Sequence, residues 1–165
     1  MKRTMLIILT VCVLAALNFA IYQKERILKE GETVYLELAP VDPRSMLQGD
    51  YMRLSFNLEG RISHEAGRSG PKRGQVVVTL DENSVARFVR LHQGESLQPG
   101  EKLIPYSADG SFITIQPNAF FFQEGERAEF QRARYGRFAF GGNGERILVG
   151  LAAEDRTMLP AKANP

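Results

Sequence analysis

The first 30 residues follow a different hydrophobic pattern from the rest of the chain. From Thr4 to Gln23 no residue is charged, and twenty residues of α-helix measure about 30 Å, the thickness of a bilayer's hydrocarbon core. Tyr22 stands at the distal end, where an amphipathic ring suits the membrane interface. Lys24 to Glu30 can continue the helix for two turns, stabilised by i,i+4 ion pairs. The pattern predicts an anchor that contacts the lipid bilayer through residues 4–23.

A cleaved signal peptide begins with the same combination of positive charge and an apolar core. Its core is usually shorter, and the small-residue cleavage pattern is matched poorly by Leu14-Ala15-Ala16 and Asn18-Phe19-Ala20. We therefore expect an uncleaved, single-pass anchor. Basic residues flank both ends, so their count does not fix the orientation, but long domains translocate largely regardless of charge. We expect a bacterial cytoplasmic (inner) membrane protein whose C-terminal domain lies outside.

After Gly31 the hydrophobic period changes to two residues, which is typical of half-buried strands. Val34, Leu36 and Leu38 alternate with polar residues, and a second alternation runs over residues 51–58. Further strands are expected at residues 75–80, 85–92, 111–116, 119–123, 135–140 and 145–151, with a short helix within 125–134 and a solvated loop over 60–74.

About eight strands and one short helix predict a mainly β (β-rich α+β) fold, either a curled antiparallel sheet or a barrel-like sandwich. We divide the chain into an anchor and juxtamembrane helix (1–30), an extracytoplasmic β domain (31–157) and a frayed tail (158–165).

Charge and composition exclude several partners. The net charge is +2, and residues 1–30 carry +3 from five basic and two acidic side chains, which leaves −1 for the domain. A near-neutral domain lacks the basic surface that nucleic acids require. Cys12 is the single cysteine, and His64 and His92 show no metal-ligand spacing. We expect no nucleic acid, no metal and no cofactor.

The densest group of distinctive residues surrounds Gly49-Asp50-Tyr51, which Leu54 and Phe56 follow. This segment resembles the motif of the bacterial GDYXXLXY family, with phenylalanine in place of the final tyrosine. Three further segments fit the same family: Pro40-Val41-Asp42-Pro43-Arg44, Phe121-Phe122-Gln123-Glu124-Gly125 and Ala133-Arg134-Tyr135-Gly136. The resemblance covers most of residues 31–151. It implies a small membrane-anchored protein of unassigned function, often encoded beside a polytopic membrane protein.

The residues around this motif allow a structural and a functional interpretation. Gly49-Asp50 suits a tight turn into the following strand. Asp42, Arg44 and Asp50 would instead form a ligand clamp if they lie close together, although the same charges make an equally good structural ion pair. Glu124 precedes a turn and is a candidate partner for an arginine. The candidate ligand- or partner-binding residues are Asp42, Arg44, Gly49, Asp50, Tyr51, Arg90 and Glu124.

A second, more distant resemblance concerns the order of motifs. Ser45-Met46, Gly49-Asp50, a strand near residues 75–78 and then Arg90 are similar in order to the motifs of type I signal peptidases, whose serine is activated by a lysine. Arg90 falls where the lysine would be, and a guanidinium remains protonated and accepts no proton from serine. Ser45 is therefore a weak candidate nucleophile, and the resemblance implies a related β architecture without the catalysis.

Three functions follow from these observations. The first is a non-enzymatic, membrane-anchored accessory domain that presents a binding surface to an integral membrane protein. Three consecutive phenylalanines at 120–122 must point to both faces of a strand, and an exposed Phe121 would mark such a surface. The second is a small-ligand sensor that binds at Asp42, Arg44 and Asp50. The third is a hydrolase that uses Ser45.

Overall fold

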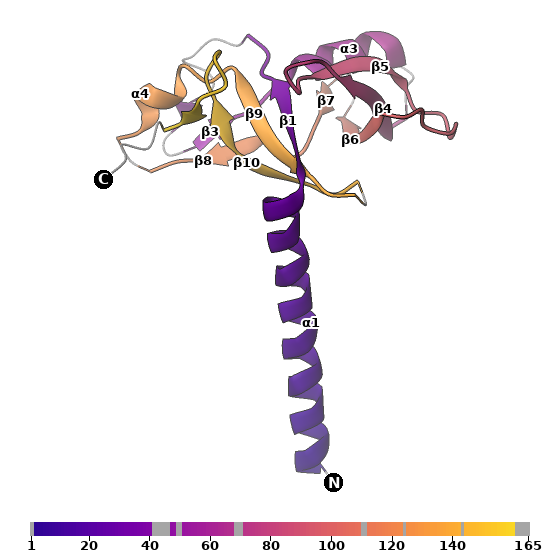
Figure 1. Cartoon of the computed structure of the whole chain (residues 1–165), viewed down its shortest axis with the longest axis vertical. Helices are drawn as coiled ribbons and strands as arrows, with labels where there is room; N and C mark the ends of the chain where they lie inside the picture. The colour runs from indigo at the N-terminus through magenta and orange to yellow at the C-terminus, as the bar shows by residue number, and fades with distance from the viewer. Residues whose placement is uncertain are drawn as a thin grey trace.

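A long N-terminal helix carries a β-rich domain in this computed structural model, which describes residues 2–40, 47–48, 51–67, 71–109, 112–123, 125–142 and 144–160 (Figure 1). The helix, α1, spans Lys2–Glu30. Its stretch Thr4–Glu30 is long and apolar enough to cross a membrane. The expected ion pairs Arg26–Glu30 (2.7 Å) and Lys29–Glu25 (3.4 Å) form in its last turns.

Three antiparallel sheets make up the domain. The first has the order β1(Glu32–Glu37)-β9(Tyr135–Phe140)-β10(Arg146–Ala152)-β11(Met158–Leu159). The second has the order β2(Leu47–Gln48)-β3(Tyr51–Arg53)-β8(Ala119–Phe121). The third has the order β5(Ala86–Leu91)-β4(Arg73–Leu80)-β6(Lys102–Asp109)-β7(Phe112–Thr114).

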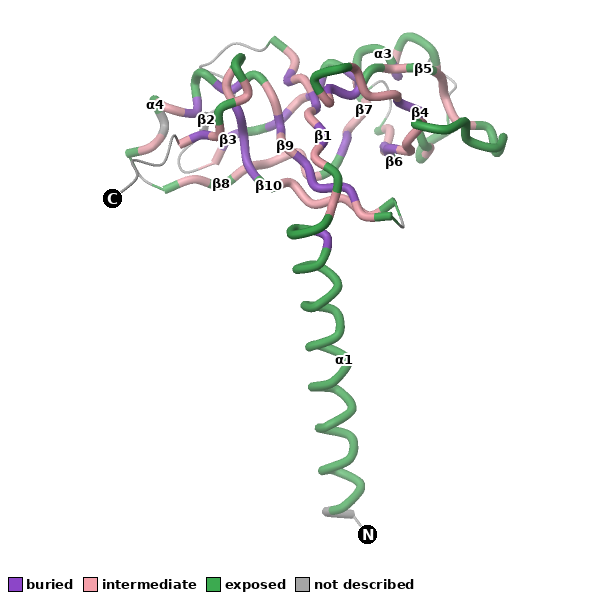
Figure 2. Tube along the Cα trace, in the orientation of Figure 1, coloured by how far each residue is buried: buried purple, intermediate pink, exposed green. Residues whose placement is uncertain are grey.

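Strand β1 connects the three sheets around one core. Its Tyr35 forms a bridge with Val85, just before β5, and the following Leu38 forms a bridge with Phe56, just after β3. Val34 and Leu36 of β1 are fully buried, whereas Thr33, Tyr35 and Glu37, which alternate with them, are half-buried. Figure 2 shows the buried residues gathered inside the domain, whereas α1 is exposed along nearly its whole length. The predicted fold, a β-rich domain of curled antiparallel sheets after an apolar helix, is confirmed.

The strand expected over residues 51–58 and the loop expected over 60–74 are wrong in part. Strand β3 ends at Arg53, and a ten-residue helix, α3, spans Asn57–Ala66. Leu58 and Ile62 lie one turn apart on its buried face. The carboxylate of Glu59 accepts hydrogen bonds from the Ser55 hydroxyl (2.7 Å) and the Ile115 N–H (2.8 Å), which attaches the start of α3 to the segment after β7.

Replacing Gly60 by alanine should stabilise the domain by about 0.5–1 kcal/mol, because glycine inside a helix loses more conformational entropy than alanine. A Cβ atom at Gly60 meets no heavy atom within 4 Å. Gly67, at the C-terminal end of α3, has a φ of +63° and a ψ of −171°, so Gly67→Ala should instead destabilise. Urea unfolding in non-ionic detergent, followed by circular dichroism, measures both. Equal effects would contradict the helical role of Gly60.

Three smaller differences complete the comparison. Strand β6 was not predicted, because its Pro105 interrupts the sequence pattern of a strand. In the sheet, Pro105 lies opposite Gln75 of β4 and outside the short segment of β6 that pairs with β7, so the proline is tolerated. Met158 and Leu159 were assigned to the frayed tail, but they pair with β10 because burying Leu159 completes this edge of the core. The helix expected within 125–134 is the single turn α4 (Arg127–Phe130).

Candidate functional site

Of the candidate site residues predicted from the sequence, Tyr51 and Arg90 lie within the described part of the structure. The others, Asp42, Arg44, Ser45, Gly49, Asp50 and Glu124, lie outside the described residues. The ligand clamp at residues 42–50 and the hydrolase hypothesis at Ser45 therefore stay predictions.

Tyr51 belongs to an aromatic surface shared by β3 and β8. It lies opposite Phe121 in the antiparallel pair, and the two ring centroids are 5.9 Å apart. Phe121 is 75% exposed. Its neighbours Phe120 and Phe122 turn to the other face of the chain, where their rings pack 5.2 and 5.3 Å from that of Phe130. The three consecutive phenylalanines thus point to both faces, with Phe121 outward. We call the Tyr51–Phe121 pair the aromatic surface.

A second exposed phenylalanine was missed by the sequence analysis. Phe112 of β7 is 79% exposed. The signal was present, because alternation along Phe112-Ile113-Thr114-Ile115 puts Phe112 and the fully buried Ile115 on opposite faces. Among the described strands, β7 and β8 are both edge strands of their sheets. Each of these edges therefore carries one outward phenylalanine.

Strand β8, which ends at Phe121, runs on the side of the domain from which α1 leaves. Figure 1 shows β8 and β10 along the border of the domain nearest to α1. If Gln23 marks the edge of the hydrocarbon, the seven residues Lys24–Glu30 raise the domain by about 10 Å above it. At this height the base of the domain would lie beside the lipid headgroups.

The end of α1 packs against the domain. Ile27 is only 8% exposed, and the N–H of Gly31 donates to its carbonyl oxygen at 2.9 Å. The ammonium of Lys24 lies 3.0 Å from the carboxylate of Glu145, beside the β9–β10 hairpin. A shallow pocket lies between the helix and this hairpin, lined among others by Phe140.

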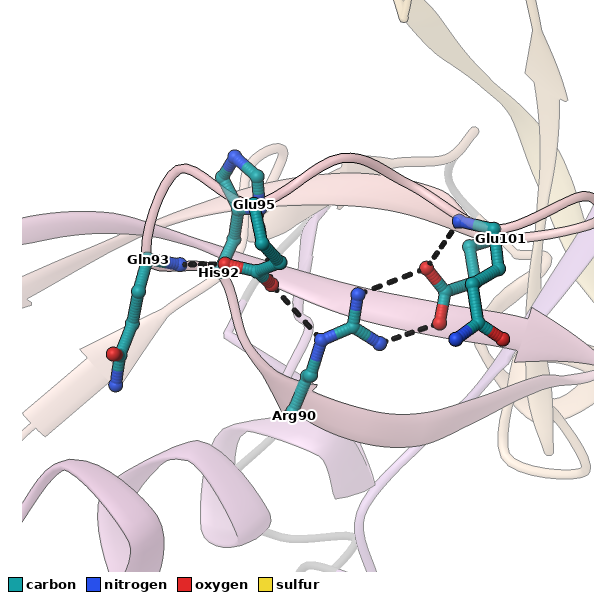
Figure 3. Close-up of polar contacts among 6 residues, drawn as sticks. Arg90, His92, Gln93, Glu95 and Glu101 are labelled. Atoms are coloured by element: carbon teal, nitrogen blue, oxygen red, sulfur yellow. Dashed lines mark hydrogen bonds and ion pairs between the residues drawn. The ribbon is translucent and has the colours of Figure 1, made fainter.

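Arg90 of β5 is the centre of a polar network that closes the connection to β6 (Figure 3). Its guanidinium donates two hydrogen bonds to the carboxylate of Glu101, and its Nε donates a third to Glu95 at 2.9 Å. The same carboxylates accept backbone N–H groups, Glu95 from Gln93 (2.7 Å) and Glu101 from Gln98 (2.8 Å). We call these contacts the arginine clamp.

The electrostatics of the clamp favour its charged state. Hydrogen bonds from the backbone N–H groups of Glu95 itself and of Gln93, together with the bond from Arg90, lower the pKa of Glu95 to about 2. The hydrogen bonds from Arg90 likewise lower the pKa of Glu101, and those to Glu101 raise the pKa of Arg90. A guanidinium held in this way does not act as a proton acceptor. These partners attach Arg90 to the β5–β6 connection, and its role in binding a ligand or partner stays a prediction.

A family model described as GDYXXLXY protein matches residues 13–151. The chain belongs to the GDYXXLXY family. The match covers most of the chain and confirms the resemblance read from Gly49-Asp50-Tyr51 and Leu54. Searches with the chain found no matching curated protein and no matching solved structure.

The described part of the GDYXXLXY motif serves both the surface and the core. Tyr51 is partly exposed beside Phe121, whereas Leu54 and Phe56 are buried. The ring of Phe56 packs 5.9 Å from that of Phe138. Of the described motif residues, Tyr51 is therefore the one that a partner can reach. Within the same described part of the chain, no group of three or more His, Cys, Asp or Glu side chains is placed to hold a metal ion.

Replacing Arg90 by lysine should loosen the connection between β5 and β6, because an ammonium cannot reproduce the planar fork that binds Glu101. We expect amide exchange at Gln93 and Gln98 to become several-fold faster than in the wild type, measured by hydrogen–deuterium exchange. Arg87→Lys on the same strand, whose partners are Asp81 and Glu37, should leave these two amides unchanged.

The protection of Gln93 should also depend on pH with a definite sign. The folded-state pKa of Glu95, about 2, lies below its ordinary value of 4.5. Its stabilising contribution is therefore complete above pH 4.5 and is lost as the pH falls through about 2. Exchange at Gln93, corrected for the intrinsic rate, should be constant from pH 7 to pH 4.5 and rise towards pH 2. A rise centred near pH 4.5 would contradict the role of the clamp.

Proposed function

We propose that this chain is a non-enzymatic accessory protein of the bacterial cytoplasmic membrane, held by α1 with its domain outside, which presents the aromatic surface to an integral membrane partner. The observation that carries the proposal is the exposure of Phe121, 75% of whose side chain is accessible on a strand at the α1 side of the domain. Large apolar side chains in such positions are typical of protein-binding surfaces.

The retention of α1 as an anchor is supported by its continuity with the domain. The helix runs without a break from Lys2 to Glu30, and Ile27 and Lys24 contact the domain directly. Because α1 is one continuous helix, residues 4–23 are joined directly to the two turns that pack on the domain. An anchored domain needs no high affinity for a partner in the same bilayer, because both are confined to one surface.

The character of the aromatic surface supports a protein partner. Tyr and Phe are enriched at the centre of protein interfaces. The outer edge of β8, among the described strands, forms no ladder with another strand, so its backbone groups are open to an added chain beside Phe121. At about 10 Å above the hydrocarbon, this edge is within reach of the loops that connect transmembrane helices.

Capture from membranes tests the proposal. Tagged full-length chain, extracted in mild non-ionic detergent, should recover an integral membrane protein in stoichiometric amount. Phe121→Ser should reduce the recovery by tenfold or more, the usual scale for losing a buried aromatic anchor. Phe112→Ser is the matched control, since Phe112 is equally exposed on β7, and it should leave the recovery unchanged.

Two results would contradict the proposal. If the chain is recovered without any other membrane protein, or if both phenylalanine variants lose the partner equally, the aromatic surface is not the docking site. Intact-mass measurement of the purified chain tests the anchor separately, because release of a form that lacks residues 1–23 into the soluble fraction would exclude tethering.

A further inference from the structure

Asn18 is the most polar residue deep within the apolar stretch 4–23 of α1. It lies five residues before Gln23, which places it about 7 Å inside the hydrocarbon, too deep for a short amide side chain to reach the interface. Its Nδ2 donates to the carbonyl of Leu14 at 2.9 Å, and this is its one hydrogen bond among the described residues. One N–H and the side-chain carbonyl oxygen are left over. In lipid such groups find partners on a second helix.

Thr10, the other polar side chain deep in the anchor, does not share this problem. Its hydroxyl donates to the carbonyl of Leu6 at 3.0 Å. Because its single donor is satisfied within its own helix, Thr10 needs no partner from outside. Of these two side chains, Asn18 is therefore the one that keeps unused hydrogen-bonding groups among the described residues.

Asn18 lies on a stripe with the spacing of a two-stranded helix pair. The stripe consists of Ile7, Val11, Leu14, Asn18 and Ile21, which alternate in steps of four and three residues. This is the seven-residue repeat of a left-handed coiled coil, with a β-branched residue and the asparagine at equivalent positions. One polar asparagine at such a position fixes the register of a pair of parallel helices.

The stripe faces away from the β9–β10 hairpin. Ile27, which docks on the β9–β10 hairpin, follows Asn18 by nine residues, and at about 100° per residue it lies half a turn round the helix. The small residues Cys12, Ala16 and Ala20 lie on the Ile27 side, beneath the hairpin. The Asn18 side is thus the one along which a second helix can approach without meeting the hairpin.

We propose that two copies of this chain form a parallel homodimer through the Asn18 stripe of α1. In a parallel pair with two-fold symmetry, the two Asn18 amides meet at the same depth. Each donates its remaining N–H to the carbonyl oxygen of the other, so both groups that the single helix leaves over are used. A second copy of the chain has the same asparagine at the same depth. An unrelated helix would need a polar residue of its own at that depth.

The stripe remains compatible with a dimer above the lipid. Its next positions are Glu25, whose carboxylate is paired with Lys29 at 3.4 Å, and Leu28, which is 49% exposed although it is apolar. The paired charge reduces the repulsion between two glutamates, and a second helix would cover Leu28. The inference rests on the proposal that α1 stays in the bilayer, and it concerns a different surface from the aromatic one.

Cysteine crosslinking of the full chain in liposomes locates the interface. In a Cys12→Ser background, single cysteines are introduced by Leu14→Cys and Ile21→Cys on the stripe, and by Ala16→Cys and Ala20→Cys on the opposite face. Mild oxidation should give disulfide-linked dimers from the first two and not from the second two. Wild-type Cys12 should also remain uncrosslinked. Crosslinks on the Cys12 side instead would overturn the proposal.

Sedimentation in non-ionic detergent tests the role of the amide. Asn18→Leu should raise the dimer dissociation constant roughly 5- to 30-fold, the range expected for interhelical side-chain hydrogen bonds. Thr10→Val is the matched control and should leave it unchanged. A monomeric intact chain overturns the dimer, and an Asn18→Leu variant that dimerises like the wild type overturns the pairing through the Asn18 amides; neither result bears on the aromatic surface. An intact mass that lacks residues 1–23 overturns both the dimer and the anchor.

Discussion

Replacing Phe138 by alanine should lower the free energy of unfolding of the domain by about 3–5 kcal/mol, the usual cost of deleting a buried aromatic ring. Phe138 is fully buried in the middle of β9, between Val34 of β1 and Leu148 of β10. Its ring packs 5.9 Å from that of Phe56 and 6.5 Å from that of Phe140. The main sheet contributes one strand on each side of the ring, so the cavity cannot close without moving a strand.

The loss is large compared with the total stability of a typical domain, which is about 5–15 kcal/mol. Urea unfolding in non-ionic detergent measures it, with circular dichroism following the loss of strand signal. If Phe138→Ala does not fold, Phe138→Leu should still be measurable, with a smaller loss of about 1–1.5 kcal/mol. Phe112→Ala, at an exposed ring, should change the stability by less than about 0.5 kcal/mol. Equal effects at Phe138 and Phe112 would contradict the assigned core.

The strands that the sequence predicted correctly are those whose alternation coincides with burial. Val34 and Leu36 of β1 are such residues, and so is Phe138 of β9. The hairpin of β9 and β10 was predictable because glycines at residues 141–144 separate two apolar runs. In these segments the local pattern and the tertiary environment demand the same conformation, so local reasoning is sufficient.

The errors arise where tertiary contacts override the local pattern. Residues 52–58 alternate cleanly, and Met52, Leu54, Phe56 and Leu58 are all buried, but the chain turns into α3 before the last of them. The first turn of α3 is stabilised by the carboxylate of Glu59, which accepts a hydrogen bond from the N–H of Ile115. A contact between residues 56 positions apart cannot be recognised from a local stretch of sequence. Gly60 also made this segment resemble a loop, because glycine is rare inside helices.

The candidate site was predictable to a similar degree. The outward direction of Phe121 follows from the alternation of three phenylalanines, and its pairing with Tyr51 requires the register of β3 and β8. Arg90 was a candidate because of its position in the order of motifs. Its partners Glu95 and Glu101 were not predictable, because they lie between β5 and β6 in a segment without a hydrophobic period. Local sequence identifies which residues are unusual, whereas the sheet topology determines which of them meet.

The junction between α1 and β1 is closely packed around one glycine, Gly31. A Cβ atom at Gly31 would lie 2.2 Å from the carbonyl oxygen of Ile27 and 3.1 Å from that of Phe140. Both are backbone atoms, so they cannot swing aside as a flexible side chain does. A residue larger than glycine must therefore displace either the last turn of α1 or the β9–β10 hairpin.

Gly31→Val should consequently lower the stability by about 1–3 kcal/mol, the usual cost of forced overpacking. It should also release Ile27 from the hairpin, which hydrogen–deuterium exchange over residues 27–33 detects as faster exchange. Gly142→Ala is the control, because a Cβ atom there meets nothing within 4 Å, and it should behave like the wild type. If the proposed docking requires a set orientation of the domain above the membrane, Gly31→Val should weaken partner capture although Phe121 is intact. Undiminished capture together with a loosened junction would show that the partner does not depend on a set orientation.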